Sequence, residues 1–508
     1  MSAKHLGTMG CIGLSLAAAC ASSPGGQAGA LEPRFLAVHN TLAAMGTVTI
    51  AGTKSSGRVL GANDSIRIGV AGLNGRGGAH VGAFAGMPGV EVTYLIDPDK
   101  RTFGKRLKQI ESARGSKPQT VQDIRQALED KNLDAISVAT PNHWHSLITI
   151  WACQAGKDVY VEKPCSHNVH EGRIAVETAR KYNRIVQHGT QSRSSDSWAK
   201  TAAIIKSGQL GKLLVSRGLC YKPRPSIGTR ATSTPPAEVD FNLWLGPAAE
   251  RPFHTNLVHY NWHWFWDFGN GDIGNQGVHE MDKARWMIPG ATLPKSVISL
   301  GGRFGYTDQG ETANTQIAIF DYGATQLIFE VRGLKTDGYR GEKVGNICHL
   351  EGGVIAGNKF FPKGSKEPGP LPDIAGASKG KSKTDHFGNF IAAVRSRQRD
   401  VLKADILEGH YSSALCHLAN VSYRLGQPVP FNAKTKAFGD NKEAYETLAR
   451  MEEHLAKGNG LNLDGLQYRL GRKLVIDAKT ETIVGDAEAN ALLTRHYRAP
   501  FAVPEKVS

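Results

Sequence analysis

Short apolar runs alternate with stretches of helical character along the first part of the folded sequence. The runs are rich in β-branched and aliphatic residues, which is typical of buried parallel strands, and they cover residues 65–71, 90–96, 133–139, 157–161 and 184–188. Residues 170–182, between two of these runs, are predicted to form a helix. Alternation of strands and helices at this spacing predicts a doubly wound parallel sheet with right-handed crossovers. We therefore expect an α/β domain over residues 65–190.

Residues 191–440 follow a different pattern. Apolar and polar positions alternate at residues 316–322 and 325–331, which predicts antiparallel strands with one covered face. We expect a second domain here, over residues 191–440. Residues 441–508 contain one helical stretch, 443–455, and a tail that we expect to wrap around this domain.

The first 64 residues are predicted to lie outside the fold because they carry little apolar bulk. Residues 11–19 form a short apolar core that runs into Cys20, a loose match to a lipoprotein cleavage box. A second apolar stretch covers residues 35–51, but Glu32 and Pro33 stand where a twin-arginine leader has its arginine pair. Two interpretations stay open. One is an export-type leader and linker on a periplasmic protein, with or without a lipid anchor; the other is a disordered N-terminus on a cytoplasmic protein.

Composition narrows the class of ligand. The net charge of +15, from 61 Lys and Arg against 46 Asp and Glu, is spread along 508 residues without a basic block. This distribution fits small anionic ligands better than nucleic acid, for which no recognition module is visible. No apolar run approaches the roughly 20 residues of a membrane span. The seven cysteines form no CxxC pair or zinc-type cluster, so we predict no metal site.

The first predicted strand leads into a glycine-rich turn that reads Gly-x-Gly-x-x-Gly, with Asn74 at the middle glycine. Gly72 permits the tight turn, the later glycines let backbone and helix approach, and the helix N-terminus faces a pyrophosphate. Asparagine weakens the match without removing it, because it also adopts left-handed backbone angles. The turn predicts cofactor contacts from Gly72, Leu73, Asn74, Gly75, Arg76 and Gly77.

Asp97 ends the second predicted strand, 20 residues after Gly77. A carboxylate at this spacing typically binds the adenosine ribose of a dinucleotide. Asp97 also stands at the start of a helical stretch, so it could cap that helix instead of, or in addition to, binding the ribose. A carboxylate here favours NAD because it repels the 2′-phosphate of NADP, while Lys100 and Arg101 keep NADP as the alternative.

Polar residues also follow the third and fourth predicted strands, and ligands bind at this edge of a doubly wound sheet. A lysine at a strand end, near a nicotinamide and helix N-termini, is expected to have a lowered pKa, which suits a proton relay. The further residues expected to contact the cofactor are Thr140, Pro141, Asn142, His145, Glu162 and Lys163.

The glycine turn, Thr140-Pro141-Asn142 with His145, and Glu162-Lys163-Pro164 together resemble the glucose–fructose oxidoreductase/inositol dehydrogenase (Gfo/Idh/MocA) family. The likeness covers most of residues 65–440. It implies a Rossmann domain followed by a substrate-binding α/β domain with an open, mainly antiparallel sheet that often forms an oligomer interface. It also implies oxidation or reduction of a sugar or cyclitol carbon with NAD or NADP, in which Lys163 binds the reacting hydroxyl.

Two candidate substrate contacts come from the second domain. Three of the eight tryptophans lie within residues 262–266, beside a glycine-rich loop. Aromatic faces suit sugar C–H surfaces, so Trp264 is one candidate, with a core cluster as the alternative interpretation. The other is Asp282, which follows His279 by one helical turn.

Asn275 and His279 are four residues apart, so on a helix they would share a face. Relatives commonly have aspartate at the position of Asn275. An amide can orient a hydroxyl but cannot take its proton, so the acid/base role would fall on His279 with Lys163. We expect a near-neutral pKa for His279 in this role. The predicted catalytic residues are therefore Lys163, His279 and Asn275.

Three functions are consistent with these residues. The first is an NAD(P)-dependent oxidoreductase that transfers hydride to or from a sugar, a cyclitol or a derivative. The second is a glycosidase or lyase that oxidises its sugar transiently with a tightly held, recycled NAD, which export would favour because free NAD is scarce outside the cytoplasm. The third is a nucleotide-bound sensor or scaffold, which Asn74 and Asn275 keep open. We expect a small carbohydrate as partner and a homo-oligomer formed through the C-terminal sheet.

Overall fold

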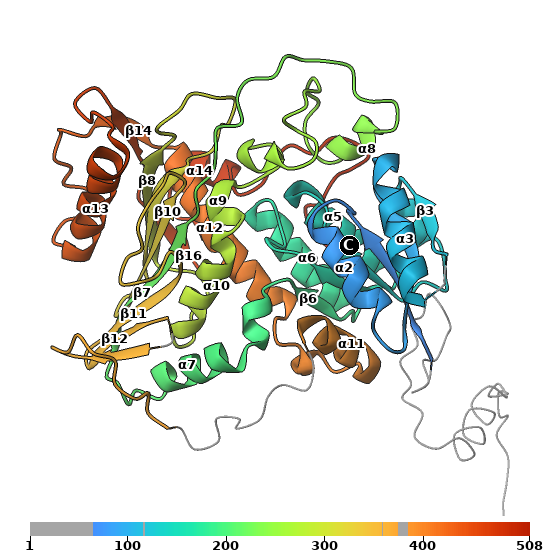
Figure 1. The fold of residues 1–508 in the computed structure, drawn as a ribbon, viewed down its shortest axis with the longest axis horizontal. Coiled ribbons are helices and arrows are strands. Elements are labelled where there is room, and N and C mark those ends of the chain that lie inside the picture. The colour runs from blue at the N-terminus through green and yellow to red at the C-terminus, as the bar shows by residue number, and fades with distance from the viewer. Residues whose placement is uncertain (1–63, 115–116, 358, 374–384, 508) are drawn as a thin grey trace, which may run out of the picture. The chain divides into compact units, whose positions relative to one another are not determined.

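The computed structural model describes residues 64–507, apart from residues 115–116, 358 and 374–384. Residues 1–63, which carry nearly all of the predicted leader and linker, lie outside the described residues. The described chain forms two sheets with their own helices (Figure 1). Among the helices described, none combines the length and the apolar character needed to cross a bilayer.

The first sheet has six parallel strands in the order β3-β2-β1-β4-β5-β6. These strands are β1 (Ile66–Ala71), β2 (Val90–Ile96), β3 (Gln119–Val121), β4 (Ala135–Val138), β5 (Asp158–Val161) and β6 (Val186–His188). The predicted doubly wound parallel sheet is confirmed. The short edge strand β3 is an addition, because its largely exposed residues form no apolar run.

Helices cover both faces of this sheet. One face packs against α4 (Ile124–Leu128), α5 (Asn142–Gln154) and α6 (Val169–Lys181), and the other against α2 (Arg76–Ala85) and α3 (Phe103–Arg114). The strand order reverses between β1 and β4. The loops after these two strands therefore diverge and leave a crevice at the carboxyl edge of the sheet.

Two later segments of the chain complete this domain. Helix α11 (His386–Ser396) places Phe390 and Val394 in the same core as β1. On the opposite face, the C-terminal tail places the Phe501 ring with its centroid 5.5 Å from that of Trp144 on α5. Domain boundaries read along the sequence, such as the one at residue 190, therefore describe the strands but not these additions.

The second sheet has eleven strands, with the main path β13-β12-β11-β7-β10-β9-β8-β15-β14. Only the β7–β10 pair is parallel among the pairs described, so the predicted open, mainly antiparallel sheet is confirmed. The predicted strands at 316–322 and 325–331 correspond to β9 and β10. The strands are β7 (Leu213–Tyr221), β8 (Ser296–Gly302), β9 (Thr315–Asp321), β10 (Gln326–Arg332), β11 (Val344–Leu350), β12 (Gly353–Ala356), β13 (Lys359–Pro362), β14 (Gln427–Pro430), β15 (Gln467–Leu470), β16 (Leu474–Asp477) and β17 (Thr482–Ile483).

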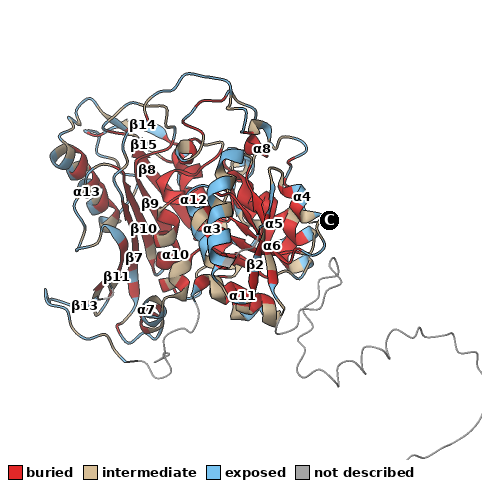
Figure 2. Cartoon of the chain, turned by 45° about the vertical axis from the view of Figure 1, so that its right-hand side comes forward, coloured by how far each residue is buried: buried red, intermediate tan, exposed pale blue. Residues whose placement is uncertain are grey.

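Helices lie on both faces of the second sheet as well (Figure 2). Helices α10 (Gly277–Met287) and α12 (Ile406–Arg424) bury Met281 and Leu415 against the face toward the first domain. Helix α13 (Lys442–Asn459) buries Leu448 and Met451 against Ile319 and other residues of the outer face. The helix predicted at residues 443–455 thus occupies part of the sheet face through which we expected oligomers to form.

Candidate active site

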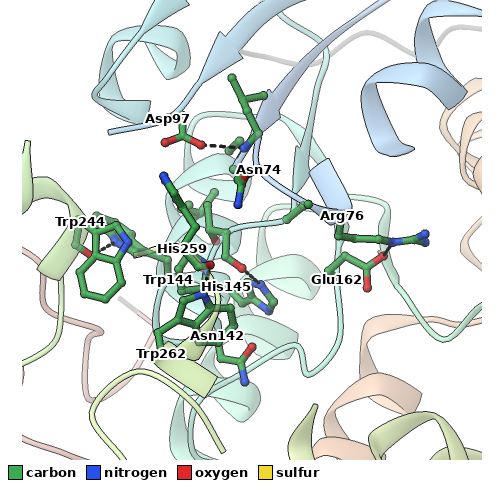
Figure 3. A pocket seen from close by; sticks show the side chains of 18 of the residues that line it. Asn74, Arg76, Asp97, Asn142, Trp144, His145, Glu162, Trp244, His259 and Trp262 are labelled. Atoms are coloured by element: carbon green, nitrogen blue, oxygen red, sulfur yellow. Dashed lines mark hydrogen bonds and ion pairs between the residues drawn. The ribbon is translucent and has the colours of Figure 1, made fainter. Parts of the chain in front are cut away.

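A cavity of about 540 Å³ opens at the carboxyl edge of the parallel sheet, in the crevice between the β1 and β4 loops (Figure 3). In this view the Arg76–Glu162 pair lies on one side of the cavity and Trp244 on the other. Most of the predicted site residues line it. These are Gly72, Leu73, Asn74, Gly75, Arg76, Asp97, Thr140, Pro141, Asn142, His145, Glu162, Lys163, Asn275 and His279.

The glycine turn is shaped by close backbone approaches. Gly72 has φ +82°, and a Cβ there would lie 2.5 Å from the backbone nitrogen of Thr140. A Cβ on Gly77 would lie 1.8 Å from the Gly72 carbonyl oxygen, so Gly77 brings α2 against the turn but does not itself line the cavity. Asn74 has no positive φ, which explains how the motif accepts a side chain at its middle position. The turn leaves the space that a pyrophosphate needs at the N-terminus of α2.

Asp97 is buried and holds the glycine turn in place. Its two carboxylate oxygens accept hydrogen bonds from Leu73 N at 2.8 Å and Asp99 N at 2.9 Å. Each oxygen keeps a second lone pair, which a ribose hydroxyl can use. Burial raises the pKa of Asp97 to about 6, although the two backbone donors oppose this shift.

The capping role left open for Asp97 belongs to Asp99. The Asp99 carboxylate caps the short 3-10 turn Lys100–Thr102 by accepting from Arg101 N at 3.0 Å. The Arg101 guanidinium also donates to Asp99, with Nη2 at 2.6 Å from Oδ2. Arg101 is therefore already paired and is a poor candidate for binding a 2′-phosphate, which favours NAD over NADP.

Glu162 connects the end of β5 to the start of α2. Its Oε1 accepts from Arg76 Nε at 2.7 Å and from Gln191 Nε2 at 3.0 Å, and His80 Nε2 lies 3.0 Å away. Burial alone would raise its pKa, but His80, Arg76 and Lys163 hold the pKa of Glu162 well below its usual value. Glu162 is therefore ionised, and it fixes the position of the helix whose N-terminus faces the cavity.

His145 ties the two turns after β4 and β5 together. Its ring nitrogens lie 2.6 Å from the Pro164 carbonyl oxygen and 2.7 Å from the Thr140 carbonyl oxygen. Burial lowers the pKa of His145. The residue therefore lines the cavity while also setting the spacing between the turns on either side.

Lys163 reaches across the cavity to the second domain. Its Nζ donates to the Asn275 backbone oxygen at 2.9 Å and lies 3.3 Å from the Asn275 side-chain oxygen. Burial lowers the pKa of Lys163, as predicted from its position, although Glu162 and Asp272 oppose the shift. The Lys163 amine therefore loses its proton at a lower pH than the amine of an exposed lysine does, and the unprotonated amine can accept a proton.

Two expectations about Asn275 and His279 are wrong. The residues do not share one helix, because α9 (Gly271–Gly274) ends before Asn275 and α10 begins at Gly277. Burial, followed by the charge of Lys163, lowers the pKa of His279 to about 3, far from neutrality. Both side chains still line the cavity. His279 is therefore a neutral ring near Lys163, and Lys163 is the stronger base of the two.

The two predicted substrate contacts are not among the residues that line this cavity. The Asp282 carboxylate is fully buried, accepts from Arg193 Nε at 2.9 Å and binds the Ser412 hydroxyl at 2.7 Å. Trp264 is 5% exposed and packs in the aromatic core, with the Arg224 guanidinium carbon 5.4 Å from its ring centroid. Trp264 is therefore part of a core cluster under the loop, which was the alternative interpretation of this residue.

Sequence reasoning missed a segment of the second domain that forms part of the cavity wall. We call residues 236–263 the covering segment; it contributes Leu243, Trp244, His259, Tyr260, Trp262 and His263 to the lining. The aromatic run at 262–266 signalled that a tryptophan would face the site, but the structure selects Trp262 rather than Trp264. No local pattern marks Trp244 or His259.

The covering segment is bound to the first domain by several hydrogen bonds. The backbone nitrogen of Lys100 donates to Glu238 O at 3.0 Å, and that of Asp240 donates to Pro98 O at 2.9 Å. His259 Nε2 lies 2.7 Å from Asp99 Oδ2, next to the residue expected to bind ribose. These contacts hold the segment over the end of β2.

Two family models match the chain. The model described as "Oxidoreductase family, NAD-binding Rossmann fold" matches residues 66–190, and "Oxidoreductase family, C-terminal alpha/beta domain" matches residues 217–307. Both models belong to the Gfo/Idh/MocA group. The first spans the six strands of the parallel sheet, and the second spans most of β7 and all of β8 in the other sheet.

Curated relatives match parts of the chain. A scyllo-inositol 2-dehydrogenase (NAD(+)) of Bacillus subtilis is 29% identical over 174 residues, which is 34% of this chain and 47% of the relative. A glycosyl hydrolase family 109 protein of Shewanella pealeana is 29% identical over 135 residues, which is 26% of this chain and 30% of the relative. The matches therefore span about half the length of these relatives or less.

A solved structure agrees with the fold over more of the chain. The WlbA dehydrogenase of Bordetella pertussis, crystallised with NADH and UDP-GlcNAcA, is 20% identical with a TM-score of 0.52, and the match covers 71% of this chain and 97% of that one. The family models therefore place residues 66–190 and 217–307 in the Gfo/Idh/MocA family of oxidoreductases, the first of them as an NAD-binding Rossmann fold.

Proposed function

We propose that this protein is an NAD-dependent oxidoreductase that transfers hydride to or from a carbon of a sugar, a cyclitol or a derivative. The observation that carries the proposal is one continuous cavity with two chemically different ends. Asp97 and the glycine turn lie at the dinucleotide end. The buried amine of Lys163 and the ring of His279 lie where a substrate hydroxyl can be held.

The residues present fit an NAD molecule. The turn at Gly72 and Gly77 has backbone approaches that no Cβ would allow, and it leaves the N-terminus of α2 facing the cavity. Asp97 has lone pairs for the ribose, and the covering segment provides Trp244 and Trp262 around the same cavity. When bound, the nicotinamide supplies the hydride acceptor or donor.

The chain's own residues would handle the proton. In the oxidative direction, the unprotonated Lys163 amine takes the proton of the substrate hydroxyl, and in the reductive direction it returns that proton. Asn275 holds Nζ through its backbone oxygen and can orient the hydroxyl through its amide. His279, being neutral, adds no charge to the site and can offer a ring nitrogen to the substrate.

The experiment is a substrate screen with the purified full chain and NAD, read out as NADH absorbance. Cyclitols, aldoses and sugar acids are each tested with NAD and with NADP. The proposal expects turnover of at least one class and a preference for NAD. If the chain binds neither nucleotide in calorimetry, the proposal is overturned.

A redox-neutral glycosidase is the second candidate, and the covering segment is the observation that favours it. A segment hydrogen-bonded to the first domain beside Asp97 would slow cofactor exchange, which suits a reaction that restores NAD in every cycle. Protein purified without added nucleotide is denatured, and the supernatant is analysed for NAD(H) by chromatography. Stoichiometric release directs the search toward glycosides and paired sugar substrates; empty protein that binds added NAD indicates a freely exchanging dehydrogenase.

Assembly and location are proposals that need their own tests. Homo-oligomerisation through the second sheet would use the strands that α13 leaves uncovered, and light scattering of the purified protein measures the mass directly. Export from residues 1–64 is tested by fractionation of cells expressing the full chain: a processed periplasmic or membrane-anchored product supports a leader, and an unprocessed cytoplasmic product supports the alternative.

A further inference from the structure

A second cavity, of about 220 Å³, lies behind the loop that follows β5. Its walls come from the start of α6, the loop before α9, the end of α12 and the C-terminal tail, and they share no residue with the lining of the first cavity. Ser166, three residues after Lys163, lies 3.0 Å from His417 in this wall. The cavity therefore adjoins the loop that carries Lys163.

His167 presents an unpaired donor in this wall. Its Nδ1 accepts a hydrogen bond from Arg495 Nη1 at 3.1 Å, because a guanidinium can only donate. Burial lowers the pKa of His167 well below its usual value, so the ring is neutral and its hydrogen sits on Nε2. That Nε2 is buried and has no partner among the residues described.

Asn270 presents a second unpaired donor. The side chain is 5% exposed, and its Oδ1 lies 3.2 Å from His417 Nδ1. Its backbone oxygen accepts from Asn420 Nδ2 at 3.0 Å, which fixes the loop. Within the described part of the chain the Asn270 amide nitrogen has no acceptor. A buried amide without an acceptor costs free energy, so the site is incomplete without a ligand or water that accepts.

Two arginines give the cavity positive charge. Arg424 ends α12, and its guanidinium carbon lies 5.2 Å from the Trp266 ring centroid. Among the described residues, none accepts a hydrogen bond from the Arg424 guanidinium. Arg495 donates to the Asp267 backbone oxygen at 2.9 Å in addition to His167, which holds its guanidinium at the wall.

Acidic groups nearby offset only part of this charge. The two acids that act on Arg424, Asp267 and Glu311, are both paired with Arg251, whose Nη1 lies 3.0 Å from Asp267 Oδ2 and 3.6 Å from Glu311 Oε1. Glu171, beneath His167, accepts from the His167 backbone nitrogen at 2.9 Å. Burial raises the pKa of Glu171 to about 7, so near neutral pH it carries only part of a negative charge.

We propose that this cavity binds a small organic anion, with a carboxylate or phosphate group accepting from His167, Asn270 and the two arginines. An anionic oxygen group supplies the acceptors that the wall lacks, and charge-assisted hydrogen bonds to arginine are the strong ones. At about 220 Å³, the cavity has room for a ligand of the size of a monosaccharide acid. Nothing in this assignment depends on the reaction proposed for the first cavity.

Isothermal titration calorimetry of the full chain tests the site. The probes are D-glucuronate, inorganic phosphate and, as the neutral comparison, D-glucose, all at one ionic strength and with NAD present so that the glycine turn is not free for phosphate. The variants are Arg424→Gln and Arg495→Gln. Lys457→Gln is the matched control, because it removes one positive charge from the exposed surface of α13. The Arg424 change breaks no hydrogen bond of its guanidinium to a described residue, so folding is expected to survive it.

We expect at least one anion to bind, Arg424→Gln and Arg495→Gln to weaken it by about tenfold or more, and Lys457→Gln to leave it unchanged. The tighter of the two anions then identifies the group as carboxylate or phosphate. No binding of either anion up to about 10 mM overturns the proposal. Equal binding to parent and arginine variants also overturns it, as does glucose binding that is as tight as that of glucuronate and is weakened to the same extent by the arginine variants.

Discussion

Replacing Lys163 by methionine tests the proposed chemistry most directly. Methionine keeps most of the apolar stem in its buried place and removes the amine that lies 2.9 Å from the Asn275 backbone oxygen. Loss of a positioned proton acceptor lowers rates by ~10²–10⁴, which corresponds to about 3–5 kcal/mol of transition-state stabilisation. We therefore expect kcat/KM for the oxidative reaction to fall by at least about a hundredfold.

The pH profile separates a chemical role from a structural one. Since burial lowers the pKa of Lys163 from its usual 10.5, oxidative kcat/KM of the parent is expected to rise with pH and level off above that lowered pKa. In Lys163→Met this rise disappears, because the group that must lose its proton is gone. Steady-state NADH formation across the pH range is the assay.

A second buried lysine provides the matched control. Lys157 starts the same β5 region, its Nζ donates to the Asp130 backbone oxygen at 2.7 Å, and burial lowers its pKa too. It does not line the cavity. Lys157→Met is expected to cost stability, about 1–3 kcal/mol for the acceptor left unpaired, with kcat/KM unchanged. Turnover of Lys163→Met within about threefold of the parent, or an equal loss in Lys157→Met, would refute the catalytic assignment.

Four further changes test the surroundings of the site and the stability of the fold. Asp97→Asn is expected to weaken NAD binding by about tenfold in calorimetry. The NAD affinity of the parent should fall as the pH drops below about 6, where this carboxylate takes up its proton. An NAD affinity that does not change across this pH range would contradict the ribose contact. Gly77→Ala places a Cβ 1.8 Å from the Gly72 carbonyl oxygen, so it should lower both the Tm and NAD affinity, and a variant with parental values would mean that α2 shifts freely. His259→Ala removes the 2.7 Å contact between His259 Nε2 and Asp99 Oδ2 in the first domain, so we expect NAD release to accelerate by about tenfold in stopped-flow dilution. An unchanged release rate would show that the covering segment does not retain the cofactor. Burial alone would raise the pKa of Glu481, but hydrogen bonds from His410 and Arg173 lower it to about 2. The ionised acid therefore stabilises the fold above its unfolded pKa of 4.5, and Glu481→Gln should lower the free energy of unfolding by up to about 3 kcal/mol at neutral pH. Denaturant titrations should show this loss shrinking as the pH falls from 4.5 toward 2.

Much of the first domain follows from local sequence. A buried parallel strand needs a short apolar run, and the turn after β1 needs glycine where backbone atoms come too close for a side chain. Both features can therefore be recognised from a few consecutive residues. The same is true of Glu162 and Lys163, whose place at a strand end puts them at the ligand edge of the sheet. These residues line the cavity as predicted.

The errors come from residues whose partners are remote. Asp282 looks available on a helix pattern, but Arg193, 89 residues away in sequence, pairs with it in the core. The pKa expected for His279 was wrong because burial and the neighbouring Lys163 charge, both consequences of packing, determine it. The helix expected to join Asn275 and His279 is broken between α9 and α10; Asn275 lies in the break and His279 lies on α10, and both line the cavity.

By itself, the sequence determined the α/β class, the parallel sheet, the glycine turn and the lysine at its ligand edge, because each depends on residues close together in the chain. Only the tertiary structure decided that α11 joins the first core, that α13 packs on the outer face of the second sheet, and that residues 236–263 form part of the cavity wall. These arrangements rest on contacts between segments that are far apart in the chain, and such contacts impose no periodicity on either partner.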